Sequence, residues 1–140
     1  MELTRRKILA LGAGTFAFTA VSGLPVLASA TDEAIAALTG GADLGEGVVS
    51  LTAPEIAENG NTVPIEVSAP GAVAITVFAD GNPIPAVATV NFGKLNPTRS
   101  ASTRIRLATT QNVVAVATME DGSFQQASAE VKVTIGGCGG

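Results

Sequence analysis

A repeated alternation of apolar and polar residues, interrupted by turn sequences, constrains the fold of this 140-residue chain more than any other feature. Val63, Ile65 and Val67 alternate with Glu66 and Ser68, which is the pattern of a half-buried strand. Similar patterns predict strands over residues 48–53, 63–68, 73–79, 86–92, 102–107, 113–119 and 127–135. Turn sequences separate them, namely Asn59-Gly60, Pro70-Gly71, Asp80-Gly81-Asn82-Pro83, Asn96-Pro97 and Asp121-Gly122. The chain is therefore expected to be all-β, an immunoglobulin-like β-sandwich of about seven short strands.

Two features refine this expectation. The chain has no Trp and a single Cys, so the disulfide and tryptophan of antibody domains are absent and "immunoglobulin-like" describes only the layering. Residues 113–117 are apolar on both faces. They predict a central strand that is covered on each side, either by the sandwich itself or by a bound subunit.

A short helix is expected before the strands. Thr31-Asp32-Glu33 supplies an N-cap and an acidic first turn, and Gly40-Gly41 supplies a stop. A helix of this length is not stable alone. We expect it to lie against the domain that follows or against a partner.

The first 30 residues resemble an export signal. Arg5-Arg6 precedes a mildly apolar stretch over residues 9–21, which is shorter than the roughly 20 residues of a membrane span. Ala28-Ser29-Ala30 is a small-residue cleavage site. We therefore predict that residues 1–30 are a twin-arginine export signal that is cleaved after Ala30. The mature chain then consists of a domain at 31–135 and an arm at 136–140. We expect it in the periplasm, with no membrane attachment after cleavage.

The only cysteine lies in the last five residues, Gly136-Gly137-Cys138-Gly139-Gly140. Glycine has no side chain and is conformationally permissive, so this segment predicts a thin, flexible arm that spans at most about 17 Å. The preceding residues Val131, Val133 and Ile135 alternate with Lys132 and Thr134 in a predicted strand, so the arm is expected to begin at the edge of a sheet. A thiol on such an arm, attached to the edge of a sheet, can reach pockets on other proteins, which favours a covalent carrier over an enzyme.

Several chemistries are excluded within the chain. It contains no His, so a Cys–His catalytic pair cannot form, and one Cys without His cannot supply a zinc or iron–sulfur site. An exposed thiol has a pKa of about 8.5 and is mostly protonated at neutral pH, so we expect activation inside partner sites. The formal net charge is −4, with no basic cluster, which argues against nucleic acid as a partner.

Two arginines mark a further surface. Arg104 and Arg106 alternate with apolar or neutral residues and should share one outward face. Solvated charges on a strand face are one interpretation. A partner contact, or a docking surface for an anionic adduct, is the other.

The tail resembles the SoxY family, the sulfur-carrier subunit of the Sox thiosulfate-oxidation system, whose hallmark is Gly-Gly-Cys-Gly-Gly at the C-terminus. The similarity covers essentially the whole chain. It includes the twin-arginine leader and the segments 53–60 leading into 63–65, 82–85, 103–107 and 131–135.

The resemblance implies a periplasmic heterodimer with the Z subunit and a reaction cycle on Cys138. In that cycle a c-type cytochrome enzyme couples thiosulfate to the thiol, and a dimanganese hydrolase releases sulfate. A sulfur dehydrogenase, where present, oxidises the remaining sulfane sulfur, and a second hydrolysis restores the thiol. Cys138 is the covalent attachment point, while Gly136, Gly137, Gly139 and Gly140 form the arm. The carrier itself is then not catalytic and holds no metal or haem cofactor.

Other interpretations stay open. The chain could be an exported structural or adhesive module that forms an intermolecular disulfide through Cys138, or a thiol enzyme. The tail could also be disordered with an incidental cysteine. Activation of the terminal diglycine as in ubiquitin-like carriers requires ATP, which an exported protein does not meet.

Overall fold

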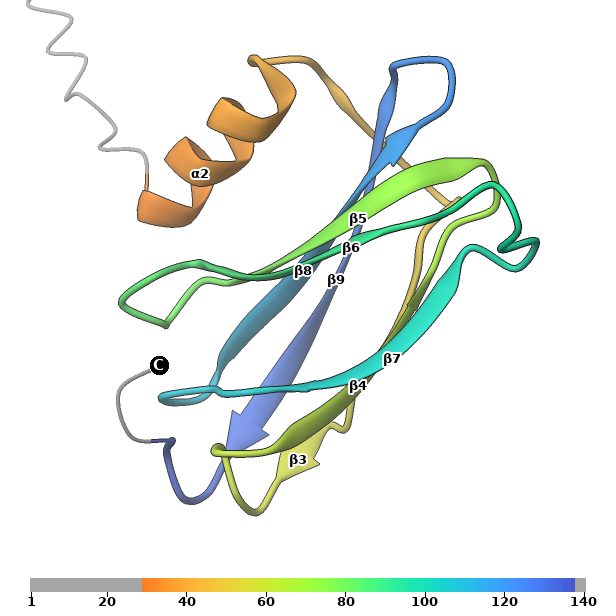
Figure 1. Ribbon diagram of the computed structural model, residues 1–140. Coiled ribbons are helices and arrows are strands. Elements are labelled where there is room, and N and C mark those ends of the chain that lie inside the picture. The colour runs from red at the N-terminus through yellow and green to blue at the C-terminus, as the bar shows by residue number, and fades with distance from the viewer. Residues whose placement is uncertain (1–28, 138–140) are drawn as a thin grey trace, which may run out of the picture.

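Two β-sheets face one another, and one helix lies over the larger sheet (Figure 1). The computed structural model describes residues 29–137. Helix α2 spans Ala30–Thr39. The strands are β1 (Leu44–Glu46), β2 (Ser50–Thr52), β3 (Ile56–Ala57), β4 (Val63–Ser68), β5 (Ala72–Ala79), β6 (Ala86–Asn91), β7 (Ser100–Ile105), β8 (Gln111–Met119) and β9 (Phe124–Val133).

The larger sheet has the strand order β1-β9-β8-β5-β6, and β3 pairs with β9 as well. The smaller sheet has the order β2-β4-β7. Strands β6 and β7 follow one another in sequence but belong to different sheets, so the chain crosses between layers there. The predicted β-sandwich with a short N-terminal helix is confirmed.

Strands β1 and β3 were not predicted from the sequence. Both run parallel to β9, β1 beside residues 124–126 and β3 beside Lys132 and Val133. They are three and two residues long, which is too short for a pattern of alternation to be visible. Their existence depends on β9, which lies about 70 to 80 residues further along the chain.

The core between the sheets follows the predicted alternation. Val63, Ile65 and Val67 are at most 4% exposed, while Glu66 between them is exposed. From the larger sheet, Ile75 and Val77 of β5 belong to the same buried cluster. Each buried aliphatic side chain of this kind stabilises the fold by about 1.5 to 3 kcal/mol relative to exposure.

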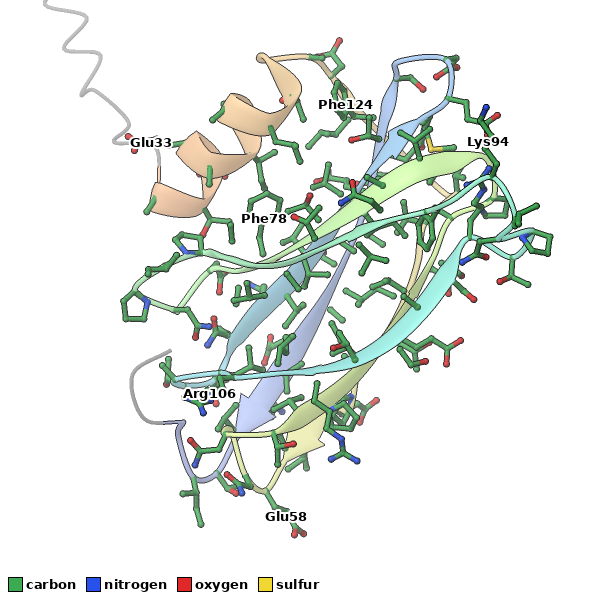
Figure 2. The ribbon with its side chains drawn as sticks, in the orientation of Figure 1. Glu33, Glu58, Phe78, Lys94, Arg106 and Phe124 are labelled. Atoms are coloured by element: carbon green, nitrogen blue, oxygen red, sulfur yellow. The ribbon has the colours of Figure 1, made fainter. Side chains whose placement is uncertain are left out.

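The central strand β8 is covered on both faces, as its apolar sequence predicts. Val113, Ala115 and Ala117 face the other sheet and are fully buried. Val116 points to the opposite face and is also fully buried, as is Phe78 of the neighbouring β5. Figure 1 shows α2 across this outer face, and Figure 2 shows Phe78 beneath it. The chain's own helix thus covers the outer face of β8. The sequence predicts the sandwich itself or a bound subunit as the cover, and not this helix.

Helix α2 begins two residues earlier than predicted. Ser29, not Thr31, is the N-cap: its hydroxyl accepts a hydrogen bond from the Asp32 amide, and the Asp32 carboxylate accepts one from the Ser29 amide. Gly40 ends the helix with a φ of 66°, as the glycine stop predicts. Within residues 29–137, no helix is long and apolar enough to cross a bilayer.

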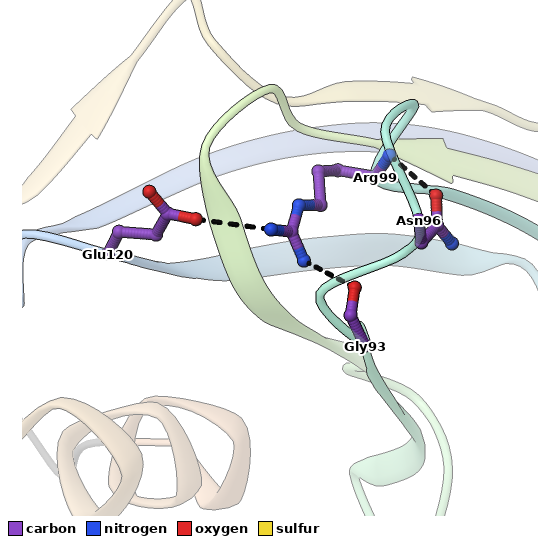
Figure 3. A network of polar contacts seen from close by, with 4 residues as sticks. All are labelled: Gly93, Asn96, Arg99 and Glu120. Carbon is purple, nitrogen blue, oxygen red and sulfur yellow. Dashed lines mark hydrogen bonds and ion pairs between the residues drawn. The ribbon is translucent and has the colours of Figure 1, made fainter.

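Arg99 holds the loop that crosses between the layers (Figure 3). Its guanidinium donates to the Gly93 carbonyl at 3.0 Å and to the Glu120 carboxylate at 3.1 Å, and its amide donates to the Asn96 side chain. These contacts satisfy polar groups of the loop between β6 and β7. We assign them a structural role.

Candidate functional site: the root of the C-terminal arm

The structure describes the first two residues of the predicted arm, Gly136 and Gly137. Cys138, Gly139 and Gly140 lie outside the described residues. The assignment of 136–140 as a flexible arm, with Cys138 as attachment point, therefore stays a prediction. What the structure adds is the geometry from which the arm begins.

Strand β9 ends at Val133, two residues earlier than predicted. Ile135, the predicted last residue of this strand, lies outside it and is 67% exposed. The reason is that the backbone leaves the sheet after Val133. Thr134 still contacts the body, since its amide donates to the Ala57 carbonyl at 3.0 Å and its hydroxyl to the Glu58 carbonyl at 3.0 Å.

Three distant segments meet just beyond the end of β9, through backbone hydrogen bonds alone. The Gly137 amide donates to the Leu107 carbonyl at 2.9 Å, and the Leu107 amide donates to the Gly60 carbonyl at 2.8 Å. The Gly60 amide in turn donates to the Ile135 carbonyl at 2.7 Å. We call this ring of Gly60, Leu107, Ile135 and Gly137 the backbone clasp.

The clasp requires glycine, because the three segments approach closely. A Cβ on Gly60 would overlap the Leu107 carbonyl oxygen and lie 2.8 Å from the Gly137 nitrogen. A Cβ on Gly136 would overlap the Ala108 carbonyl oxygen, and one on Gly137 would lie 3.0 Å from the Gly60 oxygen. Gly136 and Gly137 thus have packing partners in addition to their predicted place in the arm.

Asn82 supports the loop that carries one side of the clasp. Its side-chain amide donates to the Arg106 carbonyl at 2.8 Å, and its side-chain oxygen accepts from the Ala108 amide at 2.9 Å. The same oxygen accepts from the Gln111 side chain at 3.0 Å. Asn82 is only 6% exposed. These contacts hold Leu107, which lies between Arg106 and Ala108, in position to bind Gly137.

The surface around the clasp combines a cation with apolar side chains. Arg106 is exposed and lies toward the end of the sandwich where the described chain ends (Figure 2). Within residues 29–137 its guanidinium forms no hydrogen bond or ion pair. Ile84 and Ile135 are 66% and 67% exposed.

Arg104 is also exposed, as predicted, but its guanidinium contacts the Thr62 hydroxyl at 3.3 Å. It borders a shallow groove of about 540 Å³ on the outer face of the smaller sheet. Pro64 and Glu66 line the same groove, and Arg106 does not. A docking role for either arginine stays a prediction.

Sequence reasoning recognised Asn59-Gly60 and residues 80–83 only as turns. Their roles in the clasp depend on residues 24 to 77 positions further along the chain. No local pattern encodes such contacts. A signal that could have pointed to Gly60 is its place in the same segment, 53–60, that carries part of the family resemblance.

The backbone ring holds Gly137, the last described residue, against Leu107. Among residues 29–137 there is no group of three His, Cys, Asp or Glu side chains that could hold a metal ion. The chemistry available at this site is that of the thiol one residue beyond the clasp.

Comparisons with known proteins agree with this geometry. The family model described as "Sulfur oxidation protein SoxY" matches residues 35–138. Among solved structures, the sulfur carrier protein SoxY from Chlorobium limicola f thiosulfatophilum is 41% identical in sequence, with a TM-score of 0.63. The match covers 74% of this chain and 96% of that protein. No match is found among curated protein sequences.

More distant structures share the fold alone. Superoxide reductase (neelaredoxin) from Ignicoccus hospitalis is 17% identical, with a TM-score of 0.54 over 62% of this chain and 80% of its own. A hypothetical protein from Pyrococcus horikoshii OT3 is 15% identical, with a TM-score of 0.53 over 68% of this chain and 99% of its own. At this level of identity the similarity carries no functional argument.

Proposed function

Since the chain belongs to the SoxY family of sulfur oxidation proteins, a carrier in sulfur oxidation, we propose that it holds thiosulfate-derived groups covalently on Cys138 and presents them to partner enzymes in the periplasm. The observation that carries this proposal is that the family match extends through Cys138, the only cysteine. The clasp supports it, because it holds Gly137, the residue that directly precedes Cys138 in the sequence.

The loading step is an oxidation. The Cys138 thiolate and thiosulfate form a new S–S bond, giving a cysteine S-thiosulfonate. The two electrons released pass to a c-type cytochrome partner, one to each of two haem irons or in two successive one-electron steps. The carrier supplies the nucleophilic sulfur and no base, since the chain has no His. Activation of the thiol then belongs to the partner's active site.

The unloading step is a hydrolysis. Water attacks the terminal sulfonate sulfur, sulfate and two protons leave, and a persulfide remains on Cys138. A dimanganese hydrolase partner performs this step, and a sulfur dehydrogenase, where present, oxidises the persulfide sulfur before a second hydrolysis. The Z subunit is the proposed heterodimer partner.

Intact-mass measurement tests the proposal directly. The purified chain, its Z partner and the cytochrome enzyme are incubated with thiosulfate, and the mass of each subunit is recorded. Wild-type protein should gain the mass of the thiosulfonate group, and Cys138→Ser should gain none. Wild-type protein alkylated beforehand with iodoacetamide is the matched control, since it keeps the native sequence and blocks only the thiol.

Two outcomes would contradict the proposal. A Cys138→Ser protein that still gains sulfur mass would exclude Cys138 as the attachment point. A wild-type protein that forms only a disulfide-linked dimer and never gains sulfur would favour the structural module. Far-ultraviolet circular dichroism should be the same for both proteins, because Cys138 follows the last residue of the clasp.

The export signal is the second part of the proposal. Cleavage after Ala30 would remove Ser29, the N-cap of α2, and leave Thr31 as the first residue. Loss of such a cap costs about 0.5 to 2 kcal/mol of helix stability. N-terminal sequencing of the exported protein locates the cleavage, and Arg5→Lys with Arg6→Lys should retain the protein in the cytoplasm. Export of the double variant at the wild-type level would contradict the twin-arginine assignment.

A further inference from the structure

Asn59 is the one asparagine in the sequence that is followed by glycine. In an Asn-Gly pair the main-chain nitrogen of the glycine can attack the side-chain amide carbon of the asparagine. Glycine favours this attack, because it has no Cβ to hinder the approach. Asn59 is exposed to solvent, which supplies the water that completes the reaction. The pair is therefore chemically labile unless the fold opposes the attack.

Packing requires the glycine of this pair. Gly60 is buried, and its φ is not in the positive range. A Cβ at this position would overlap the Leu107 carbonyl oxygen and lie 2.8 Å from the Gly137 nitrogen. A bulkier residue would slow the attack on Asn59, but the backbone clasp leaves no room for one. The labile pair is thus a consequence of the close approach of the three segments.

The groups that would react are held in hydrogen bonds. The Gly60 amide donates to the Ile135 carbonyl at 2.7 Å, and the Asn59 side-chain oxygen accepts from the Asn61 amide at 3.0 Å. The attack needs a Gly60 nitrogen that has lost its proton and has turned toward Cγ of Asn59. The hydrogen bond to Ile135 must break before the nitrogen can do either.

The residues on either side of the reacting bond are held as well. The Thr134 hydroxyl donates to the Glu58 carbonyl at 3.0 Å, and the Leu107 amide donates to the Gly60 carbonyl at 2.8 Å. The segment over residues 58–60 is therefore fixed both to the chain that follows β9 and to the loop before β8. Movement of Gly60 toward the Asn59 side chain requires this segment to detach.

We infer that Asn59 is a latent modification site, at which deamidation proceeds only when the clasp opens. The Gly60 nitrogen forms a bond to Cγ of Asn59, the bond from Cγ to Nδ2 breaks, and ammonia leaves. Water then opens the cyclic imide at one of its two carbonyls, which gives aspartate or isoaspartate without any change in oxidation state. Isoaspartate places one extra carbon in the main chain before Gly60, so the modified chain can no longer keep both clasp bonds of Gly60 in their present geometry. This inference is independent of the proposed carrier function.

Ageing of the purified chain at mildly alkaline pH tests the inference. Folded chain and the same chain in urea are incubated side by side and then digested at acidic pH, where the reaction is slow. Mass spectrometry of the peptide that contains residue 59 measures deamidation, since loss of the amide changes its mass. The folded chain should deamidate at least about tenfold more slowly than the unfolded chain. Equal rates would overturn the inference.

Thr134→Val tests whether opening of the clasp controls the rate. It removes the hydroxyl that donates to the Glu58 carbonyl, at an exposed position, and leaves Asn59 and Gly60 unchanged. Deamidation of the folded variant should be faster than in wild type by about twofold to tenfold. Each rate is divided by the rate of the same variant in urea, so differences in intrinsic reactivity cancel.

Thr98→Val is the matched control. Thr98 is also exposed, and its hydroxyl donates to the Asn96 side chain at 3.1 Å, in the loop between β6 and β7. This variant should deamidate at the wild-type rate. If Thr134→Val also kept the wild-type rate while folded, the clasp would not control the reaction and the inference would be overturned.

Discussion

Asn82→Ala is the substitution that most directly tests how the folded body supports the arm. Asn82 is 6% exposed and makes three side-chain hydrogen bonds, to the Arg106 carbonyl, the Ala108 amide and the Gln111 side chain. Alanine removes all three. The Gln111 side chain keeps a second partner, the Thr109 carbonyl, whereas the two backbone groups lose the bond to Asn82.

The cost follows from those two backbone groups. A buried donor or acceptor left without its partner costs about 1 to 3 kcal/mol. Because water can reach part of this loop, we expect a total loss of about 2 to 4 kcal/mol in the free energy of unfolding. For a domain of this size that corresponds to a fall of roughly 10 to 20 °C in the melting temperature.

Urea unfolding followed by far-ultraviolet circular dichroism measures this loss, since the chain has no Trp or Tyr for fluorescence. Asn91→Ala is the control, because Asn91 is exposed on β6 and should change stability by less than about 0.5 kcal/mol. An Asn82→Ala protein as stable as Asn91→Ala would refute the assignment of Asn82 as the support of this loop.

Three further substitutions test other parts of the structure. Phe78→Ala should lower the free energy of unfolding by about 3 to 5 kcal/mol, because Phe78 is 1% exposed between the larger sheet and α2. Thermal unfolding measures this loss, and a loss below about 1 kcal/mol would contradict that packing. Ser123→Ala should raise the pKa of Asp121, which hydrogen bonds from the Ser123 side chain and backbone hold below its ordinary value of 3.8. A group whose pKa is lowered in the folded state stabilises the fold at pH values above its unfolded pKa, and this stabilisation is lost as the pH falls through the folded pKa. The wild-type chain should therefore lose the contribution of Asp121 below about pH 4. The same Asp121 pKa in both proteins, measured by NMR titration, would be evidence against these hydrogen bonds. Glu120→Gln should lower the free energy of unfolding by less than about 1 kcal/mol, because the Glu120 side chain is 61% exposed in its ion pair with Arg99. A larger loss in urea unfolding would contradict this expectation.

The sequence predicted the parts of the fold that follow from local pattern. Strand β4 lies over Val63–Ser68, as its alternation predicts, and the double-sided apolar run became the central strand β8. The short helix was predicted within two residues of its start. In each case the signal lies within neighbouring residues, where hydrophobic periodicity and capping chemistry act.

The features of the fold that the sequence did not predict have a common physical cause. β1 and β3 form only because β9 offers an edge, and Ile135 is exposed because the backbone leaves that edge after Val133. Gly60 and Asn82 were recognised as turn residues, while their contacts with the segment over residues 106–111 and with Gly137 were not. Pairings between residues so far apart depend on how the layers pack.

From sequence alone, this chain is determined to be a β-sandwich protein whose single thiol lies on a glycine-rich tail, because alternation, turn chemistry and residue counts are local properties. Tertiary structure decided how Gly136 and Gly137, the first two residues of that tail, contact the body. The backbone clasp depends on hydrogen bonds among residues 60, 107, 135 and 137, and only the packed sandwich brings those backbone groups within 3 Å of one another.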